Sequence, residues 1–357
     1  MGTYTASIIM TCFSMLVLIF LAKGGTTLTK TAKRGTIISA ALIMLCSASE
    51  CIGVMLDGAD PSFRILHIIA KIIELSVTPV IPAVFANAFF PIKAKKAAVV
   101  FFAVHGAVEV LSAFLGITFY VDEQNVYHHC TFYAAYYAAI AVGVIFLAVS
   151  VVMFNLSYQG RHKAPLYLLV AFVLTGVSVQ AVNESIRVVW LTVAFGIILF
   201  YIYYCSTILH VDGLTGLMNR RSYDNRIQNE HNRVGILFFD VNNFKGINDQ
   251  YGHQFGDKCL ISVSKAIRTA YGKDGLCYRI GGDEFCVILD KRIQRVDELN
   301  AAFDNAMAKR RAKESRLPTV SVGYSVFEPE SMTFKDAISA ADMNMYQVKN
   351  KAKAEQK

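Results

Sequence analysis

Two adjacent carboxylates, Asp283 and Glu284, directly follow two glycines, Gly281 and Gly282, inside an apolar stretch of the chain. Glycine accepts the positive φ values of a two-residue turn, and its missing Cβ leaves room for a phosphate against the backbone. The apolar flanks predict two buried strands, at 277–280 and 285–289. The pattern indicates a hairpin that holds metal and phosphate, although taken alone it is equally compatible with a solvated surface hairpin.

A second acidic position decides between these alternatives. The apolar run 234–239 predicts a buried strand, and this strand ends in Asp240. A lone buried carboxylate is costly unless it is paired or binds a metal, and carboxylate oxygens are ligands that Mg²⁺ prefers. We therefore expect Asp240 and Asp283 to share one metal ion.

The region 208–353 resembles the GGDEF domain of diguanylate cyclases through four motifs in the family's order. These motifs are Asp212 to Arg221, Phe239 to Asp257, Tyr278 to Phe285, and the set Ala341, Asp342, Met345, Tyr346 and Lys349. The resemblance implies that residues 210–357 form a cytoplasmic α/β domain of the α+β type with a ferredoxin-like palm.

The resemblance also implies a reaction in which two GTP molecules condense into cyclic di-GMP and two pyrophosphates. By matching positions, Asp240, the Val241 carbonyl and Asp283 would hold Mg²⁺, or Mn²⁺ in its place. The family treats the position of Glu284 as essential. Adjacent side chains on a regular strand point to opposite faces, so Asp283 and Glu284 can both serve the site only if the turn distorts the strand.

Other polar positions match family residues that contact GTP. Asn248 and Asp257 would contact the guanine edge, where a carboxylate accepts from two N–H donors that adenine lacks. The phosphates would meet Lys245, Lys349 and Lys353. A solvated, basic C-terminal helix is the alternative interpretation of these lysines.

Many family members carry an Arg-x-x-Asp pair upstream of the hairpin that binds the product and inhibits the enzyme. The corresponding stretch here is Gly272, Lys273, Asp274 and Gly275, which has no arginine and an acid out of register. We therefore predict that product feedback through this surface is absent.

Residues 1–209 account for the 54% hydrophobic and 17% charged composition of the chain. One membrane span takes about 20 apolar residues. On that basis we predict an all-α sensor bundle with seven spans, at 4–22, 35–57, 64–90, 97–120, 131–156, 164–182 and 188–209. A cleaved signal peptide fits the first span poorly, because its positive charges follow the apolar run.

Alternate loops of this domain are basic, and the loops between them are acidic. The basic loops carry Lys23, Lys30, Lys33, Arg34, Lys93, Lys95, Lys96, Arg161 and Lys163, and the acidic loops carry Asp57, Asp60, Asp122, Glu123 and Glu184. The positive-inside rule then puts the N-terminus outside a bacterial cytoplasmic membrane and the cyclase domain in the cytoplasm, where GTP is found. The net charge of +8 is consistent with this orientation and with phosphate contacts, so no nucleic-acid partner is expected.

Four ionisable residues lie inside the predicted spans and a fifth lies at the outer end of the seventh, where they are costly and usually face a partner or a wet cavity. They are Glu50, Lys71, Glu74, Glu109 and Arg187. They could serve only as hydrogen-bonding contacts between helices, or they could line a sensor pocket for an unknown small polar or charged ligand. Eight cysteines without metal-binding spacing predict no structural disulfide.

The function expected from these features is that of a membrane-bound diguanylate cyclase under the control of the membrane domain. Catalysis would need a homodimer, because each cyclase domain presents one GTP. No linker separates the last predicted span from Asp212, so a signal would pass through the position of the seventh helix. The alternatives are a catalytically inactive GGDEF receptor that binds nucleotide or recruits a partner, and a transporter, for which no internal repeat is evident.

Overall fold

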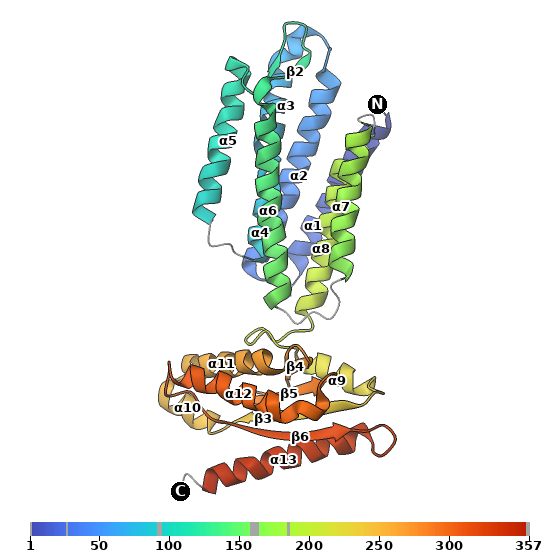
Figure 1. The fold of residues 1–357 in the computed structure, drawn as a ribbon. Helices are drawn as coiled ribbons and strands as arrows, with labels where there is room; N and C mark the ends of the chain where they lie inside the picture. The colour runs from blue at the N-terminus through green and yellow to red at the C-terminus, as the bar shows by residue number, and fades with distance from the viewer. Residues whose placement is uncertain (1, 26–27, 91–94, 158–163, 184–185, 355–357) are drawn as a thin grey trace. The chain divides into compact units, whose positions relative to one another are not determined.

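The computed structural model describes residues 2–25, 28–90, 95–157, 164–183 and 186–354. These residues form two compact units, with the main division between Cys205 and Ser206. The first unit is helical and the second combines helices with a four-stranded sheet (Figure 1).

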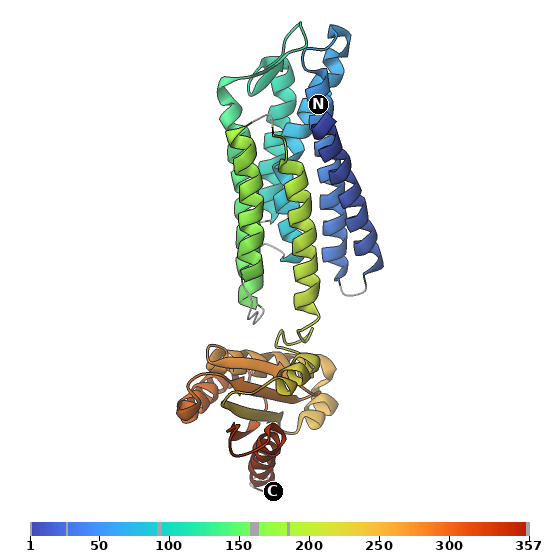
Figure 2. The ribbon, with the colours of Figure 1, turned by 90° about the vertical axis from the view of Figure 1, so that its right-hand side faces the viewer.

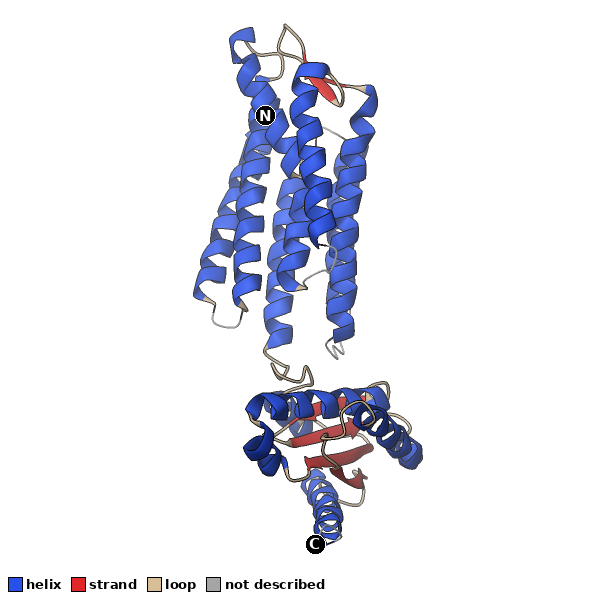
Figure 3. Cartoon of the chain, turned by 90° about the vertical axis from the view of Figure 1, so that its left-hand side faces the viewer, coloured by secondary structure: helices blue, strands red, loops and turns tan. Residues whose placement is uncertain are grey.

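Helices form in all seven stretches where spans are predicted, and they run side by side in the first unit (Figures 2 and 3). They are α1 (Gly2–Gly24), α2 (Lys30–Leu56), α3 (Arg64–Val77), α4 (Val80–Phe89), α5 (Lys95–Leu115), α6 (Ala134–Ser157), α7 (Ala164–Val182) and α8 (Val189–Ile208). Among the described residues, six stretches are long and apolar enough to cross a membrane, with α3 and α4 counting as one. The apolar part of α7, Leu166–Gln180, is shorter. The composition thus indicates a membrane protein, and the count of seven spans stays a prediction.

The third predicted span is interrupted at Pro79. Helix α3 ends at Val77 and α4 begins at Val80, because proline has no N–H to continue the helical hydrogen bonds. Helix α6 approaches this break closely at Gly143, where a Cβ would lie 2.4 Å from the Pro79 carbonyl oxygen. The interruption at Pro79 is therefore in close contact with a neighbouring helix.

The predicted end of the fourth span, residue 120, is wrong. Helix α5 ends at Leu115, where Gly116 adopts a φ of 62° and turns the chain. The following residues form an antiparallel hairpin of β1 (Phe119–Val121) and β2 (Tyr127–His129), drawn red in the helical unit of Figure 3. Apolar composition alone did not reveal this hairpin, because a three-residue strand is too short for a clear alternating pattern.

The second unit is an α+β domain with a central antiparallel sheet. Its elements are α9 (Arg220–Gln228), β3 (Val234–Val241), α10 (Phe244–Tyr251), α11 (His253–Tyr271), β4 (Gly275–Arg279), β5 (Glu284–Leu289), α12 (Val296–Arg311), β6 (Val320–Phe327) and α13 (Phe334–Ala354). The strand order is β4-β5-β3-β6, and each neighbouring pair is antiparallel. This is the order of a ferredoxin-like sheet, so the predicted fold of this domain is confirmed.

Helices cover both faces of this sheet (Figure 1). Leu237 and Phe239 of β3 pack in one core with α11 and α12, whereas Ile236 and Phe238 pack in another with α9 and α13. Side chains alternate along a strand, so position 240 belongs to the α13 face. The alternation of β3 thus decides which helix can reach Asp240.

Candidate active site

Two of the predicted catalytic acids lie opposite each other across neighbouring strands. The register of β3 and β5 pairs Asp240 with Glu284, and directly paired residues project from the same face of a sheet. Lys349 reaches Asp240 from α13 and lies 2.7 Å from both carboxylate oxygens. The structure therefore brings Asp240, Glu284 and Lys349 together.

The third acid, Asp283, lies outside the regular strand. Residues 280–283 connect β4 to β5, which begins at Glu284. The Val241 N–H donates to the Asp283 carbonyl oxygen at 3.2 Å, which ties the turn to the end of β3. Because Asp283 is in the turn, it is free of the strand alternation, and both neighbouring acids can serve one site.

The electrostatics of the three acids show that they are close enough to repel one another. Burial, followed by the negative charge of Asp240, raises the pKa of Asp283. Burial, followed by the charges of Asp283 and Asp240, raises the pKa of Glu284. A cation bound among these carboxylates would relieve the repulsion.

The donor set fits a hard divalent cation. Oδ1 of Asp240 is buried and lies 2.7 Å from the Lys349 ammonium without an aligned hydrogen bond. Within the described part of the chain, no three His, Cys, Asp or Glu side chains are placed as a ready metal site. Asp240, the Val241 carbonyl and Asp283 stay the predicted ligands, because two carboxylates and a backbone carbonyl supply the oxygen donors that Mg²⁺ prefers.

The expected reason for the two glycines is wrong in one respect. Neither Gly281 nor Gly282 has a positive φ, because the connection has four residues and needs no tight two-residue turn. The glycines matter in this turn because they lack a Cβ. At Gly281 a Cβ would lie 2.5 Å from Glu284 Oε2, whereas at Gly282 nothing lies within 4 Å. Gly282 therefore leaves the open space in which a phosphate could approach the backbone.

This difference predicts that Gly282→Ala folds normally but weakens GTP binding by about tenfold, an affinity loss of about 1.4 kcal/mol. The added methyl group would stand where the phosphate is expected. Binding of GTP by calorimetry and the melting temperature would measure the two effects. Gly213→Ala is the matched control, because a Cβ there also meets nothing within 4 Å. Equal GTP affinity in both variants would contradict a phosphate position at Gly282.

The predicted guanine contacts lie on α10 and α11. A Cβ at Gly256 would lie 1.9 Å from Asn248 Oδ1, so the Asn248 side chain packs against α11 beside Asp257. Oδ1 of Asn248 is buried without a partner, and Asp257 is exposed. An unpaired acceptor next to an exposed carboxylate suits a ligand edge that carries N–H donors.

The three lysines predicted to contact phosphates have different surroundings in the structure. Lys349 lies at the acidic site, whereas Lys245 is exposed on α10. The Lys353 side chain lies outside the described residues, although its backbone belongs to α13. Of the three lysines, Lys349 is thus the one that the fold places beside the acids.

Arg279 is a site residue to which the sequence analysis assigned no role. Its guanidinium donates to the Gly282 carbonyl oxygen at 2.7 Å and to Asp212 at 3.1 Å. Burial raises the pKa of Asp212, but hydrogen bonds from Thr215 and the Arg279 charge outweigh it and lower the pKa overall. Arg279 thus ties the acidic turn to the start of the domain. The sequence offered one signal for this role, because Arg279 lies inside one family motif and Asp212 lies inside another.

The acid in the degenerate product-binding stretch has a structural role. Asp274 is 6% exposed and accepts from Arg292 Nε at 2.7 Å. Its carbonyl oxygen also accepts from the N–H groups of Asp290 and Lys291. The carboxylate and the carbonyl oxygen of Asp274 therefore already have hydrogen-bond partners within the domain.

This arrangement predicts that added cyclic di-GMP does not inhibit the enzyme through this surface. The rate at saturating GTP should stay constant as product is added up to concentrations well above the GTP concentration. Lys273→Ala serves as the comparison, because it changes the surface without touching the Asp274 pair. Noncompetitive inhibition that Lys273→Ala relieves would contradict the prediction.

The five ionisable residues of the membrane domain contact one another or nearby polar groups. Lys71 pairs with Glu74 at 2.9 Å, and Arg187 lies 3.5 Å from Glu50. Glu109 accepts from Thr118 and lies 3.7 Å from His105, and it is fully buried. These contacts are compatible with both interpretations, hydrogen bonding between helices and a polar pocket. Several loop charges used for the topology, namely Lys93, Arg161, Lys163 and Glu184, lie outside the described residues.

Comparison with known proteins identifies the second unit. Residues 209–355 match the family model described as the diguanylate cyclase GGDEF domain. This part of the chain is a GGDEF domain of the diguanylate cyclase family.

The relatives share this domain. The diguanylate cyclase TpbB of Pseudomonas aeruginosa is 35% identical over 157 residues, which are 40% of this chain and 36% of TpbB. The cyclic di-GMP phosphodiesterase PdeR of Escherichia coli is 34% identical over 155 residues, 39% of this chain and 22% of PdeR. A solved GGDEF domain of TpbB is 29% identical and covers 40% of this chain and 90% of that structure, with a TM-score of 0.35. The chain thus spans about a third or less of the length of these two full-length relatives.

Proposed function

We propose that this protein is a membrane-bound diguanylate cyclase that condenses two GTP molecules into cyclic di-GMP and two pyrophosphates. The observation that carries the proposal is the grouping of Asp240, Asp283 and Glu284 beside Val241 and Lys349 where the two central strands β3 and β5 meet the turn. Carboxylates whose pKa values are raised by burial and by one another's charge are typical of functional sites.

In this proposal the residues of the site position one GTP. Asp257 and Asn248 would hold the guanine edge, the open space at Gly282 would admit the phosphates, and Lys349 would balance their charge. A Mg²⁺ ion held by Asp240, the Val241 carbonyl and Asp283 would supply Lewis-acid stabilisation of phosphoryl charge. Arg279 would keep the turn in place through the Gly282 carbonyl oxygen.

The reaction joins two nucleotides, and each domain offers one set of these residues. Each 3′-hydroxyl attacks the α-phosphorus of the other GTP, and pyrophosphate leaves. Two copies of the chain would therefore have to face each other, so we propose a homodimer as the active form. Orientation of the two reactants is the main contribution the protein can make to such a reaction.

The membrane domain is proposed to be the sensor, with seven spans and with the cyclase domain in the cytoplasm. Its apolar helices and the basic residues of alternate loops support this orientation. An unknown small ligand of this domain is part of the proposal, although the Lys71 and Glu74 pair also fits a purely structural role.

A catalytically inactive receptor remains the second candidate, because a similar domain also occurs in PdeR, a protein named as a phosphodiesterase. The purified full chain should be incubated in lipid nanodiscs with GTP and Mg²⁺, and the products analysed by mass spectrometry. Cyclic di-GMP and pyrophosphate are expected in a ratio of one to two. GTP binding without any cyclic product would establish the receptor instead.

A further inference from the structure

The N-terminal end of helix α8 contacts the carboxylate of Glu50 on α2. Glu50 accepts a hydrogen bond from the Trp190 indole N–H, and Arg187 lies 3.5 Å from the same carboxylate. The Trp190 residue is 8% exposed, and the Glu50 side chain is 12% exposed. The Tyr4 ring of α1 lies 5.5 Å from the Arg187 guanidinium. We call Glu50, Arg187 and Trp190 the Glu50 latch.

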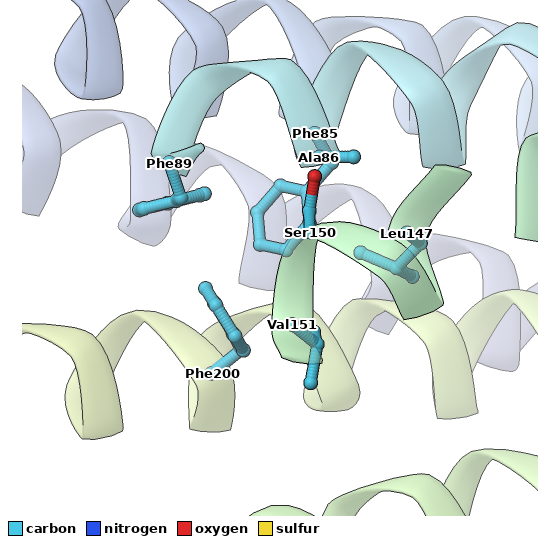
Figure 4. Close-up of a pocket in the computed structure, with 7 residues that line it drawn as sticks. All are labelled: Phe85, Ala86, Phe89, Leu147, Ser150, Val151 and Phe200. Carbon is cyan, nitrogen blue, oxygen red and sulfur yellow. The ribbon is translucent and has the colours of Figure 1, made fainter. Parts of the chain in front are cut away.

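The other half of α8 is held by aromatic rings. Phe200 lies 5.2 Å from Phe85 and 5.0 Å from Phe89, and Tyr204 lies 4.6 Å from Phe89. Figure 4 shows Phe200 across a small cavity from the two phenylalanines of α4, with Ser150 of α6 beside them. The cavity measures about 10 Å³, so the rings have little spare room beyond that of a single water.

These two attachments differ in how they respond to a displacement of α8. Aromatic rings stay in contact in offset-stacked and in edge-to-face arrangements over a range of centroid distances, so the rings can tilt and remain in contact. A carboxylate with an indole N–H and a guanidinium depends on direction, and breaking it inside the bundle leaves a poorly solvated charge. The Glu50 latch is therefore the attachment with two distinct states, made and broken, and the aromatic cluster can act as the pivot.

The helix that carries the latch continues almost directly into the cyclase domain. Helix α8 ends at Ile208, and Asp212 already bonds to Arg279, which holds the Gly282 carbonyl oxygen. We propose that the Glu50 latch is the switch of the membrane domain, and that its opening lets α8 tilt about the aromatic cluster and changes cyclase output. The effect on output rests on the proposed cyclase function.

Trp190 is the single tryptophan of the chain, so its fluorescence reports the latch directly. The full chain in detergent micelles, which contain no scaffold protein, should be compared with Glu50→Leu, Arg187→Gln and Trp190→Phe, each taken from the monodisperse fraction in size exclusion. Glu123→Gln is the matched control, because Glu123 is an exposed acid in the β1–β2 hairpin. The readouts are the Trp190 emission maximum and the rate of cyclic di-GMP formation per folded molecule.

The latch predicts that Glu50→Leu and Arg187→Gln shift the Trp190 emission. All three latch variants should change the cyclase rate in the same direction, by about fivefold or more, the size of an ordinary allosteric coupling. Glu123→Gln should change neither readout. A shifted emission with an unchanged rate would overturn the latch as a switch, and an unshifted emission would show that the contact is not made. If the wild-type chain itself forms no cyclic di-GMP, the proposed function is overturned. The proposal that the latch controls cyclase output then fails as well.

Discussion

Asp240→Ala and Asp283→Ala should each reduce cyclic di-GMP formation by about a hundredfold or more. Each change removes a proposed ligand of the metal ion, and loss of residues that merely support ligands already costs about 10- to 100-fold in metal sites. The rate of product formation at saturating GTP and Mg²⁺ measures the effect. Mn²⁺ binding to the same variants, followed by electron paramagnetic resonance, gives a readout that does not depend on turnover.

Both variants should remain folded. Asp240 is 6% exposed but lies next to the last residue of β3, and Asp283 lies in a turn where its charge is repelled by Asp240. Removing Asp283 therefore relieves a repulsion, and its melting temperature should not fall. Asp304→Ala, which changes an exposed acid on α12, is the control. Near wild-type turnover in either site variant would refute the assignment of the metal ligands.

Asp257→Ser should lower the preference for GTP over ATP by about 10- to 100-fold, because hydrogen bonds to a charged group contribute about 1.5–3 kcal/mol. The carboxylate can accept from both N–H donors of the guanine edge, and serine cannot replace it as a charged acceptor. Competition of ATP and GTP for the purified chain, measured as the ratio of dissociation constants, tests the prediction.

Asp249→Ser is the matched control for this experiment, since Asp249 is an exposed acid next to Asn248 on α10. It should leave the GTP to ATP ratio unchanged. If Asp257→Ser discriminates against ATP as strongly as the wild type, another group recognises the base, and the unpaired Asn248 oxygen would be the next candidate.

Many strands and site acids of the cyclase domain were predictable from local patterns along the chain. The apolar run 234–239 forms a strand that is buried at every position, because alternate side chains face two separate cores. The acid at its end and the acids after Gly282 were therefore recognisable as a site. The apolar helices of the first unit were equally predictable, since their length and composition depend on neighbouring residues only.

Local patterns failed where the geometry depends on how elements pair. The φ values of Gly281 and Gly282 follow from the four-residue connection, and its length depends on where β4 and β5 stop pairing. The end of α5 depends on Gly116 and on the short hairpin after it. In both places the hydrophobic pattern was correct, but it does not determine the register of the partner segment.

By itself, then, the sequence determined the class of each domain and the acids that could bind a metal, because these depend on residue type and short spacing. Only the tertiary structure decided the partners that are far apart in the chain. Lys349 and Asp240 are 109 residues apart, Arg279 and Asp212 are 67 apart, and Trp190 and Glu50 are 140 apart. A long-range ion pair or hydrogen bond leaves no periodic trace in the sequence, because its two members meet only when separate helices and strands pack together.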